Sequence, residues 1–198
     1  MTHEGILEDN LKAKKASTFT VGELEVLLID RAEATYVCIR GTESNWKDIL
    51  RDLCVIPYRS ELFGYGHRGF LRGAERVLEE IEGRYDRYRP LVFSGHSLGA
   101  AVALACAVGA HIKGMTVLEY VGFGCPKVFY NAKKKLPLKV KFTLYKNGKD
   151  IVTSIPFFLG RRIIKQNKLR GSYGWWKDHA LENYLINFKT RTNKRESP

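Results

Sequence analysis

The 198-residue sequence lacks an apolar run of the roughly 20 residues that a membrane-spanning helix needs. Residues 1–15 carry acidic and basic side chains throughout and no continuous apolar stretch, so they do not resemble a secretory signal. We therefore expect a cytoplasmic protein, and release by a route without a signal peptide stays open. Repeats, linkers and low-complexity segments are absent from residues 17–188. We expect one domain over 17–188, preceded by a charged extension or short helix (1–16) and followed by a basic tail (189–198).

Cysteine is sparse, and its spacing does not match the common metal-binding motifs. The four cysteines are Cys38, Cys54, Cys106 and Cys125, and no two of them form a Cys-x-x-Cys pair. In a chain without a secretory signal, we expect reduced thiols that pack in the core. The sequence therefore predicts no disulfide, no metal site and no cofactor.

Acidic residues are outnumbered, 21 against 33 basic residues, which gives a formal net charge of +12. The basic residues gather late in the chain, at 133–135, 161–170 and 189–195. Charge of this size bears on anionic partners rather than on the fold. Two interpretations stay open: a solvated surface with a basic tail, or attraction to anionic phospholipid, to which each nearby Lys or Arg adds about 1 kcal/mol. Nucleic acid is disfavoured because no nucleic-acid-binding module is recognisable, and the oligomeric state is not predicted.

The apolar pattern predicts strands that alternate with helices, which favours an α/β fold with a mostly parallel central sheet flanked by helices. A polar turn joins the first two expected strands, and an amphipathic helix ends near Gly83. The expected strands are 25–30, 35–40, 91–94, 116–123 and 139–146, the last half-exposed near the sheet edge, and the expected helices are 70–81, 98–110 and 180–188.

The most informative motif is Gly95-His96-Ser97-Leu98-Gly99, which matches the Gly-x-Ser-x-Gly nucleophile elbow. It lies between an expected strand and an Ala-rich helix, the context in which a sharp turn lifts the serine hydroxyl above the sheet edge. Gly95 and Gly99 fit because any Cβ there would clash where strand and helix pack closely. The alternative is a glycine-rich turn that carries an ordinary serine.

A serine hydroxyl becomes a nucleophile only when an imidazole takes its proton and a carboxylate orients that imidazole. In α/β-hydrolases the chain order is Ser, then acid, then His. Only His111 and His179 follow Ser97, and His111 leaves no room for an intervening strand and acid. His179 is therefore the predicted base.

Asp150 is the preferred acid, because it follows an expected strand, and open α/β sheets place functional groups at the carboxyl ends of their strands. Glu119, within a strand, and Asp178, adjacent to His179, are its rivals. Alternatively, Asp150 is a loop residue whose side chain forms an Asx turn.

Together these residues resemble the class 3 lipases, the α/β-hydrolase family typified by triacylglycerol lipases of filamentous fungi. The matching blocks follow the family's order over roughly residues 24–184 of the chain. They are Ile39-Arg40-Gly41-Thr42, Asn45-Trp46, His67-Arg68-Gly69-Phe70, Gly95 to Ala101, Phe123 to Val128, Asn147 to Pro156, and Asp178-His179.

The resemblance implies Ser97 as nucleophile, Asp150 as orienting acid and His179 as base. It also implies an oxyanion hole formed by Thr42, through its backbone N–H and hydroxyl, and by the backbone N–H of Leu98. Thr42 has a second interpretation as a residue that caps the following helix.

Residues 43–53 stand where the fungal enzymes carry a helical lid. Four apolar residues recur there at helical spacing, namely Trp46, Ile49, Leu50 and Leu53. As a lid, this stripe would cover the active site in water and open toward lipid. As an ordinary helix, it would pack permanently on the core.

The sequence thus predicts a serine hydrolase that cleaves carboxylic esters, chiefly of lipids, through an acyl-enzyme on Ser97. A thioesterase or amidase with the same triad stays open. A non-catalytic protein that binds membrane surfaces is disfavoured, because the three catalytic residue types occur in order. If segment 161–170 docks on anionic lipid, Phe157, Phe158, Trp175 and Trp176 could anchor the same face.

Overall fold

The computed structural model describes residues 1–12, 18–41, 57–129, 136–137, 139–155, 164–171 and 173–196. Several predictions lie outside these residues. They are the oxyanion role of Thr42, the lid with its stripe of Trp46, Ile49, Leu50 and Leu53, the core thiol of Cys54, the anchoring role of Phe157 and Phe158, and the basic residues at 133–135 and 161–163.

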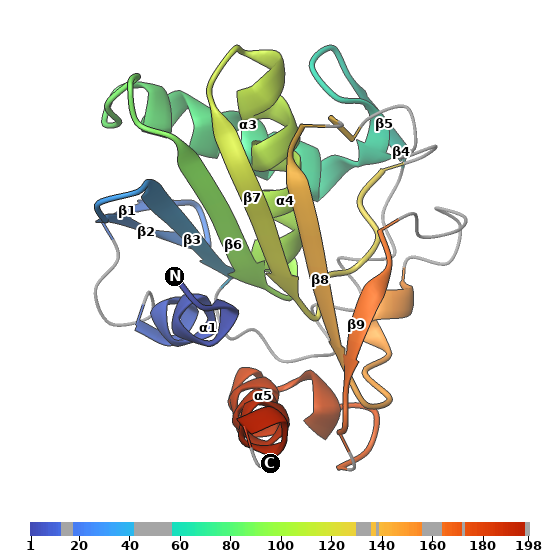
Figure 1. Ribbon diagram of the computed structural model, residues 1–198. Helices are drawn as coiled ribbons and strands as arrows, with labels where there is room; N and C mark the ends of the chain where they lie inside the picture. The colour runs from blue at the N-terminus through green and yellow to red at the C-terminus, as the bar shows by residue number, and fades with distance from the viewer. Residues whose placement is uncertain are drawn as a thin grey trace.

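A seven-stranded sheet in the order β1-β2-β3-β6-β7-β8-β9 forms the centre of the molecule (Figure 1). The first three strands pair antiparallel, and every pair from β3 to β9 is parallel. The strands are β1 (Phe19–Val21), β2 (Leu24–Asp30), β3 (Thr35–Gly41), β6 (Leu91–His96), β7 (Val117–Phe123), β8 (Lys141–Asn147) and β9 (Gln166–Leu169). The predicted α/β fold with a mostly parallel sheet is confirmed.

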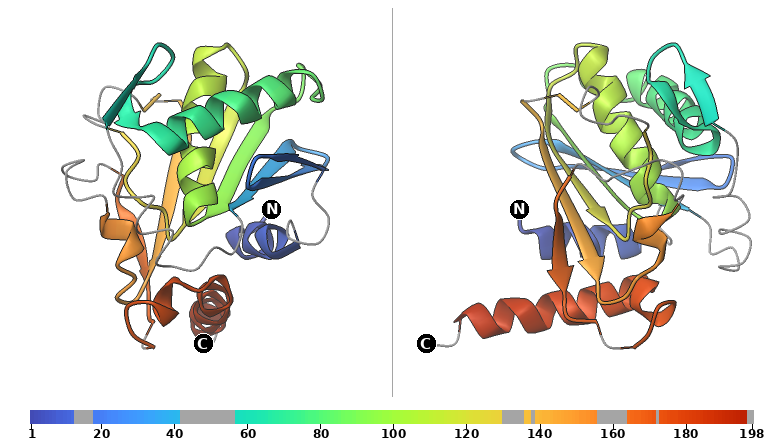
Figure 2. Two further views of the ribbon diagram at one scale, coloured as in Figure 1. Left: turned by 180° about the vertical axis from the view of Figure 1, so that it is seen from behind. Right: turned by 90° about the vertical axis from the view of Figure 1, so that its right-hand side faces the viewer.

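Helices cover both faces of the sheet (Figure 2). One face packs against α4 (Leu98–Ile112), which in turn packs against α3 (Arg68–Glu82). The other face carries α1 (His3–Lys12) and α5 (Leu181–Glu196), which contact each other. The described residues also form a separate hairpin of β4 (Pro57–Ser60) and β5 (Gly64–His67) and the 3₁₀ turns η2 (Val152–Ser154) and η4 (Lys177–His179). Among the described residues, no helix has the length and apolar character to cross a membrane.

The apolar periodicity accounts for this layering. The predicted amphipathic helix is α3, which ends at the C-cap Gly83 and buries its apolar stripe of Phe70, Leu71, Ala74, Val77, Leu78 and Ile81. Helix α4 is buried on all sides over residues 99–110, because it lies between the sheet and α3. Along the strands, side chains alternate between the two faces, so Phe93 joins the core under α4 while Val92 joins the core under α1 and α5.

The C-terminal half contains a strand that was not expected and a helix that is longer than expected. Strand β8 lies near the edge as expected, with β9 as the edge strand beyond it, and its residues 143–145 are buried. The four polar-rich residues of β9 have no alternating pattern that would announce a strand. Residues 189–196, expected as a basic tail beyond a helix that ends at 188, continue α5. In this longer helix, Lys189 Nζ lies 3.9 Å from Glu4 Oε1 and 3.1 Å from Glu8 Oε1 of α1.

Candidate active site

Ser97 lies in a strained turn between strand β6 and helix α4. Its backbone has φ 55° and ψ −124°, and it is the only non-glycine residue with positive φ in the part of the chain that the structure describes. Such a conformation costs about 1–3 kcal/mol and persists where the surrounding packing imposes it. A Cβ on Gly95 would lie 2.5 Å from the Gly99 carbonyl, and a Cβ on Gly99 would collide with the Ile39 carbonyl. The predicted role of the two glycines is confirmed.

His179 connects Ser97 to Asp150 through its two ring nitrogens. Nε2 lies 2.7 Å from Ser97 Oγ, and Nδ1 lies 2.9 Å from Asp150 Oδ2. A carboxylate only accepts hydrogen bonds, so the Nδ1–H donates to Asp150 and Nε2 is left to accept the serine hydroxyl. The structure therefore brings the three predicted residues into one hydrogen-bonded line, with Ser97 only 7% exposed.

The three residues come from separate elements that end at the same edge of the sheet. Ser97 follows β6, Asp150 follows β8, and His179 is the last residue of η4, between β9 and α5. Parallel strands bring their carboxyl ends together, which is why segments far apart in sequence meet here.

Asp150 is fully buried, and both of its carboxylate oxygens are engaged. Oδ1 accepts the backbone N–H of Val152 at 2.9 Å, so the Asx turn considered from the sequence is also present. Oδ2 accepts the Tyr184 hydroxyl at 2.6 Å in addition to His179. Burial raises the pKa of Asp150, but the facing His179 and the hydrogen bonds from His179 and Tyr184 outweigh it, so the pKa is lowered. Asp150 is thus an anion at neutral pH.

Tyr184 is a site residue that the sequence analysis did not select. It lies in α5, is fully buried, and its hydroxyl accepts the backbone N–H of Asn147 at 3.0 Å while donating to Asp150. Burial, reinforced by the charge of Asp150, raises the pKa of Tyr184 well above its ordinary value, so the phenol keeps its proton. On an apolar helix face, such a tyrosine looks like any core residue, and only the fold brings it under the carboxylate.

His96, the second residue of the elbow motif, supports the base from the other side. Its Nε2–H donates to the backbone carbonyl of His179 at 2.7 Å, and the two rings lie 4.8 Å apart between centroids. Burial, followed by the neighbouring His179, lowers the pKa of His96 to about 3. The ring is therefore neutral, which suits a single N–H donor.

The rival acids have other partners, and the rival base lies at the far end of α4 from Ser97. The buried Asp178 carboxylate accepts the backbone N–H of Lys149 at 2.9 Å and of Tyr173 at 3.0 Å. Glu119 in β7 accepts hydrogen bonds from His3 and Thr143. His111 belongs to the last turn of α4.

Leu98 is the first residue of α4, so its backbone N–H belongs to the turn whose donors have no partner within the helix. Its side chain lies against the end of β3: a Cβ on Gly41 would be 3.1 Å from Leu98 Cδ2. The strand that leads to Thr42 thus ends beside the residue after the nucleophile.

Three of the cysteines are buried thiols. Cys106 donates to the Ala74 carbonyl and Cys125 to the Pro126 carbonyl, while Cys38 accepts the Ser94 hydroxyl. The described residues contain no group of three or more His, Cys, Asp or Glu side chains placed to hold a metal ion.

The family model described as lipase (class 3) matches residues 36–160. Similar solved structures include the Lip2 lipase of Yarrowia lipolytica, with a TM-score of 0.62, 21% identity, and coverage of 75% of this chain and 62% of that chain. Rhizomucor miehei triacylglyceride lipase has a TM-score of 0.57 and 20% identity, and the match covers 72% of this chain and 59% of that chain. A further structure is described as a triacylglycerol lipase whose catalytic centre is a serine protease triad. Its TM-score is 0.57 and its identity 21%, and the match covers 72% of this chain and 59% of that chain.

The chain therefore spans less than two thirds of the length of these lipases. At this level of identity, their similarity shows that the fold is shared. No curated protein sequence is significantly similar to the chain. Since the family model spans more than half of the sequence, the chain belongs to the class 3 lipase family.

Proposed function

We propose that this protein is a serine hydrolase that cleaves carboxylic ester bonds of lipids through an acyl-enzyme on Ser97. The observation that carries the proposal is the line of hydrogen bonds from Ser97 through His179 to the buried Asp150. Family membership and the triacylglycerol lipase described for a similar structure support the same chemistry.

In the proposed reaction, Ser97 Oγ attacks the ester carbonyl carbon while its proton moves to His179 Nε2. The carbonyl π electrons pass to the oxygen, which becomes an oxyanion. Collapse of this intermediate breaks the bond to the alcohol, which takes the proton from His179 and leaves an acyl-enzyme. Water then repeats the sequence and releases the acid. Asp150 holds the ring tautomer and stabilises the imidazolium that forms.

The oxyanion needs donors that are already in place. The Leu98 N–H, at the start of α4, is one proposed donor, and Thr42 is the other. If the Thr42 hydroxyl donates, Thr42→Val should lower kcat by about 10²-fold with little change in KM. A lower melting temperature with unchanged kcat would instead make Thr42 a helix-capping residue.

Serine reactivity provides the direct test. The wild type should react with a fluorophosphonate probe and hydrolyse p-nitrophenyl esters, and Ser97→Ala should lose both while keeping its circular dichroism spectrum. Labelling that persists in Ser97→Ala would overturn the assignment of the nucleophile. Turnover of thioesters or amides in preference to esters would favour the thioesterase or amidase alternative.

The hydrogen bonds around His179 argue against the non-catalytic alternative. A binding protein on this fold would not need an imidazole facing a serine in a strained turn, since both the strain and the buried carboxylate cost stability. An anionic membrane, one of the two interpretations of the net charge of +12, is a fitting place for an enzyme of lipid esters to meet its substrate.

A further inference from the structure

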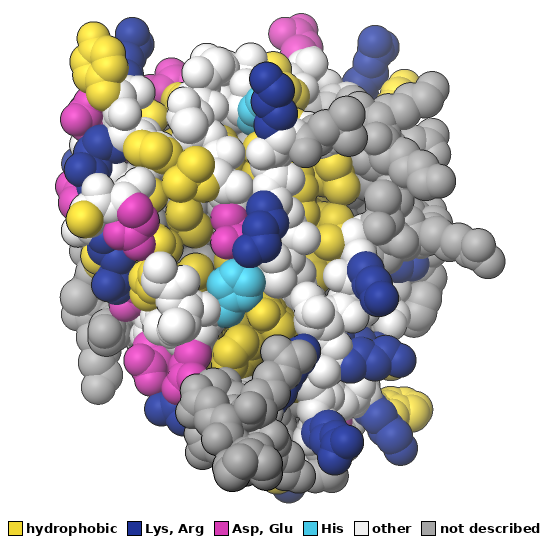
Figure 3. Space-filling model, viewed as in Figure 1, with side chains coloured by type: hydrophobic (Ala, Val, Ile, Leu, Met, Phe, Trp, Pro, Cys, Tyr) yellow, Lys and Arg dark blue, Asp and Glu magenta, His cyan; other side chains and the backbone are white. Residues whose placement is uncertain are grey.

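Lys and Arg residues gather at the edge of the sheet beside the candidate active site. They come from the end of β8 and the turn after it, from β9 and the residues on either side of it, and from the first residue of η4. We define the basic edge as Lys146, Lys149, Lys165, Lys168, Arg170 and Lys177. Figure 3 shows Lys and Arg side chains gathered over the lower right of the molecule, where β9 lies.

The charges of the basic edge are compensated less than some others on the surface. Several described cations pair with carboxylates, as Arg31 does with Asp9 at 2.7 Å and Lys113 with Glu82 at 2.6 Å, whereas others, such as Arg76 and Arg87, do not. Among the described residues, no ion pair involves a cation of the basic edge. Lys146 and Lys168 are even opposite each other in the β8–β9 register. Like charges on adjacent strand positions repel, so an anion at this edge would be favoured.

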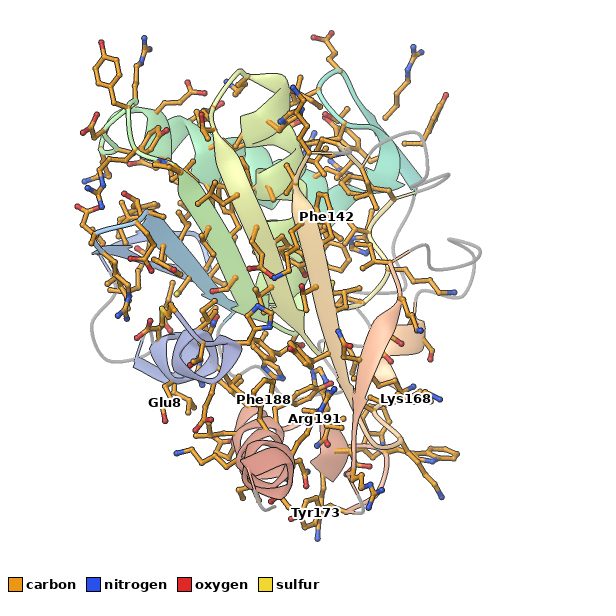
Figure 4. All side chains as sticks on the ribbon, in the orientation of Figure 1. Glu8, Phe142, Lys168, Tyr173, Phe188 and Arg191 are labelled. Carbon is orange, nitrogen blue, oxygen red and sulfur yellow. The ribbon has the colours of Figure 1, made fainter. Side chains whose placement is uncertain are left out.

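Three aromatic side chains stand exposed on the same edge. Tyr173 is 44% exposed, Trp175 57% and Trp176 36%. Figure 4 labels Tyr173 and Lys168 at this end of the molecule. Tyrosine and tryptophan rings favour the headgroup zone of a bilayer, where an apolar body and a polar tip are both accommodated.

The buried carboxylate of Asp178 holds these segments together. Its two oxygens accept the backbone N–H groups of Lys149 and Tyr173, and its own N–H donates to the Gly174 carbonyl at 2.8 Å. Asp178 is directly followed by His179, whose N–H donates to the Trp176 carbonyl at 3.1 Å. The loop that presents the aromatic residues is therefore tied to the segment that carries the candidate base.

We propose that the basic edge and Tyr173, Trp175 and Trp176 form a docking surface for membranes of anionic phospholipid. The proposal rests on the proposed function, because docking here would bring the ester bonds of a bilayer to Ser97. The cations would neutralise phosphate headgroups while the aromatic rings enter the interface. Nucleic acid or an acidic protein would use the charge, but the exposed indoles beside a lipid-ester site favour a bilayer.

Cosedimentation with vesicles tests the docking surface. The variant Lys168→Glu/Arg170→Glu is compared with Arg76→Glu/Arg87→Glu, which reverses two exposed cations away from this edge and changes the net charge equally. The wild type should bind phosphatidylglycerol-containing vesicles and bind pure phosphatidylcholine weakly. The edge variant should bind the anionic vesicles about 30-fold more weakly or worse, and added salt should reduce wild-type binding. The control variant should bind like the wild type.

A second variant guards against misfolding of the first. Trp175→Ala changes no charge and should weaken binding to anionic vesicles, with melting temperatures checked for all proteins. Hydrolysis of a short soluble ester should be unchanged in every variant. Absent turnover of that ester in the wild type, with charge-dependent vesicle binding intact, would refute the proposed hydrolase and leave the docking surface standing.

Three results would overturn the docking proposal. The wild type could bind neutral and anionic vesicles equally. The edge and control variants could lose affinity to the same extent. Single-stranded RNA or an acidic polypeptide such as polyglutamate could displace the wild type from vesicles at low concentration, which would identify a different partner for the basic edge.

Discussion

The two faces of the sheet differ in what they bury. Under α4, the core is apolar, and the strand residues that face it include Val37, Ile39 and Phe93. Under α1 and α5, and at the nearby carboxyl edge, the protein buries Asp9, Asn10, Ser94, Asn147, Asp150 and Asp178. Burial of a polar group costs free energy unless hydrogen bonds replace water. Both faces bury an apolar core that contributes stability, and the second face in addition holds side chains in place for the proposed chemistry.

On the second face, under α1 and α5 and called the polar face below, specific hydrogen bonds as well as packing hold the helices against the sheet. Asn10 Nδ2 donates to Ser94 Oγ at 3.0 Å, which ties α1 to β6. Asn147 Nδ2 donates to the Asp178 carbonyl at 3.0 Å, and its Oδ1 accepts from Asn187 of α5 at 3.0 Å. Substitutions on the two faces should therefore fail in different ways.

The largest effect is expected for Asp150→Asn, which should lower kcat by about 10⁴-fold. An amide cannot hold the His179 tautomer or stabilise its charged form. Asp178→Asn is the matched control, because Asp178 is equally buried but bonds to backbone N–H groups. It should keep kcat within tenfold when folded but lose stability, by about 2 kcal/mol or more. Hydrolysis of a soluble ester and thermal melts separate the two. Equal losses of kcat in both folded variants would remove the distinction between the carboxylates.

On the apolar face, Leu78→Ala should cost about 2–5 kcal/mol of unfolding free energy and leave the kcat of the folded enzyme unchanged. Leu78 is fully buried between α3 and α4, where a Cβ on Gly109 would lie 2.7 Å from its Cδ1. Urea unfolding measures the loss. A fall in kcat without a fall in stability would mean that this face also positions the triad.

The apolar face was the easier of the two to predict from sequence. The stripe of α3 and the strands at 25–30 and 35–40 follow from periodicity, because repeated burial leaves a repeated pattern. The motif with glycines on both sides identified Ser97 as the predicted nucleophile, and the chain order of serine, acid and histidine identified His179 as the predicted base. The structure brings these residues to hydrogen-bond distance, but their catalytic roles stay a prediction.

Other features leave no local trace in the sequence. Tyr184 and Asn147 meet only because α5 returns under the end of β8. Residues 189–196 have the composition of a solvated tail, and their helix is favoured by the partners that α1 offers, such as Glu8 for Lys189. Strand β9 depends on pairing with β8 rather than on its own residues. Long-range contacts, not propensity, determine these elements.

The smallest predicted effect concerns Glu119, on the polar face near the start of α1. Its side chain is 17% exposed, and its Oε1 lies 3.0 Å from His3 Nε2, 3.0 Å from Lys141 Nζ and 2.9 Å from Thr143 Oγ1. Burial raises the pKa of Glu119, but the hydrogen bonds from His3, Lys141 and Thr143 outweigh it and lower the pKa to about 2. The folded protein therefore favours the charged form.

A carboxyl whose pKa is lowered by folding contributes stability above its unfolded pKa, and this contribution is lost as pH falls toward the folded value. For Glu119 the window runs from the ordinary pKa of 4.5 down to about 2. Glu119→Gln should lower the unfolding free energy by roughly 2 kcal/mol at pH 7, less than the shift alone implies because Lys141 is exposed to solvent. The difference in unfolding free energy from wild type should shrink as the pH approaches 2.

Glu80→Gln removes a carboxylate that forms an exposed pair with Arg84, so it should cost under about 0.5 kcal/mol and serves as the control. Urea unfolding at pH 7 and pH 3 measures both variants. If the unfolding free energies of Glu119→Gln and wild type differ by the same amount at pH 7 and pH 3, the charge of the Glu119 carboxylate does not stabilise the fold.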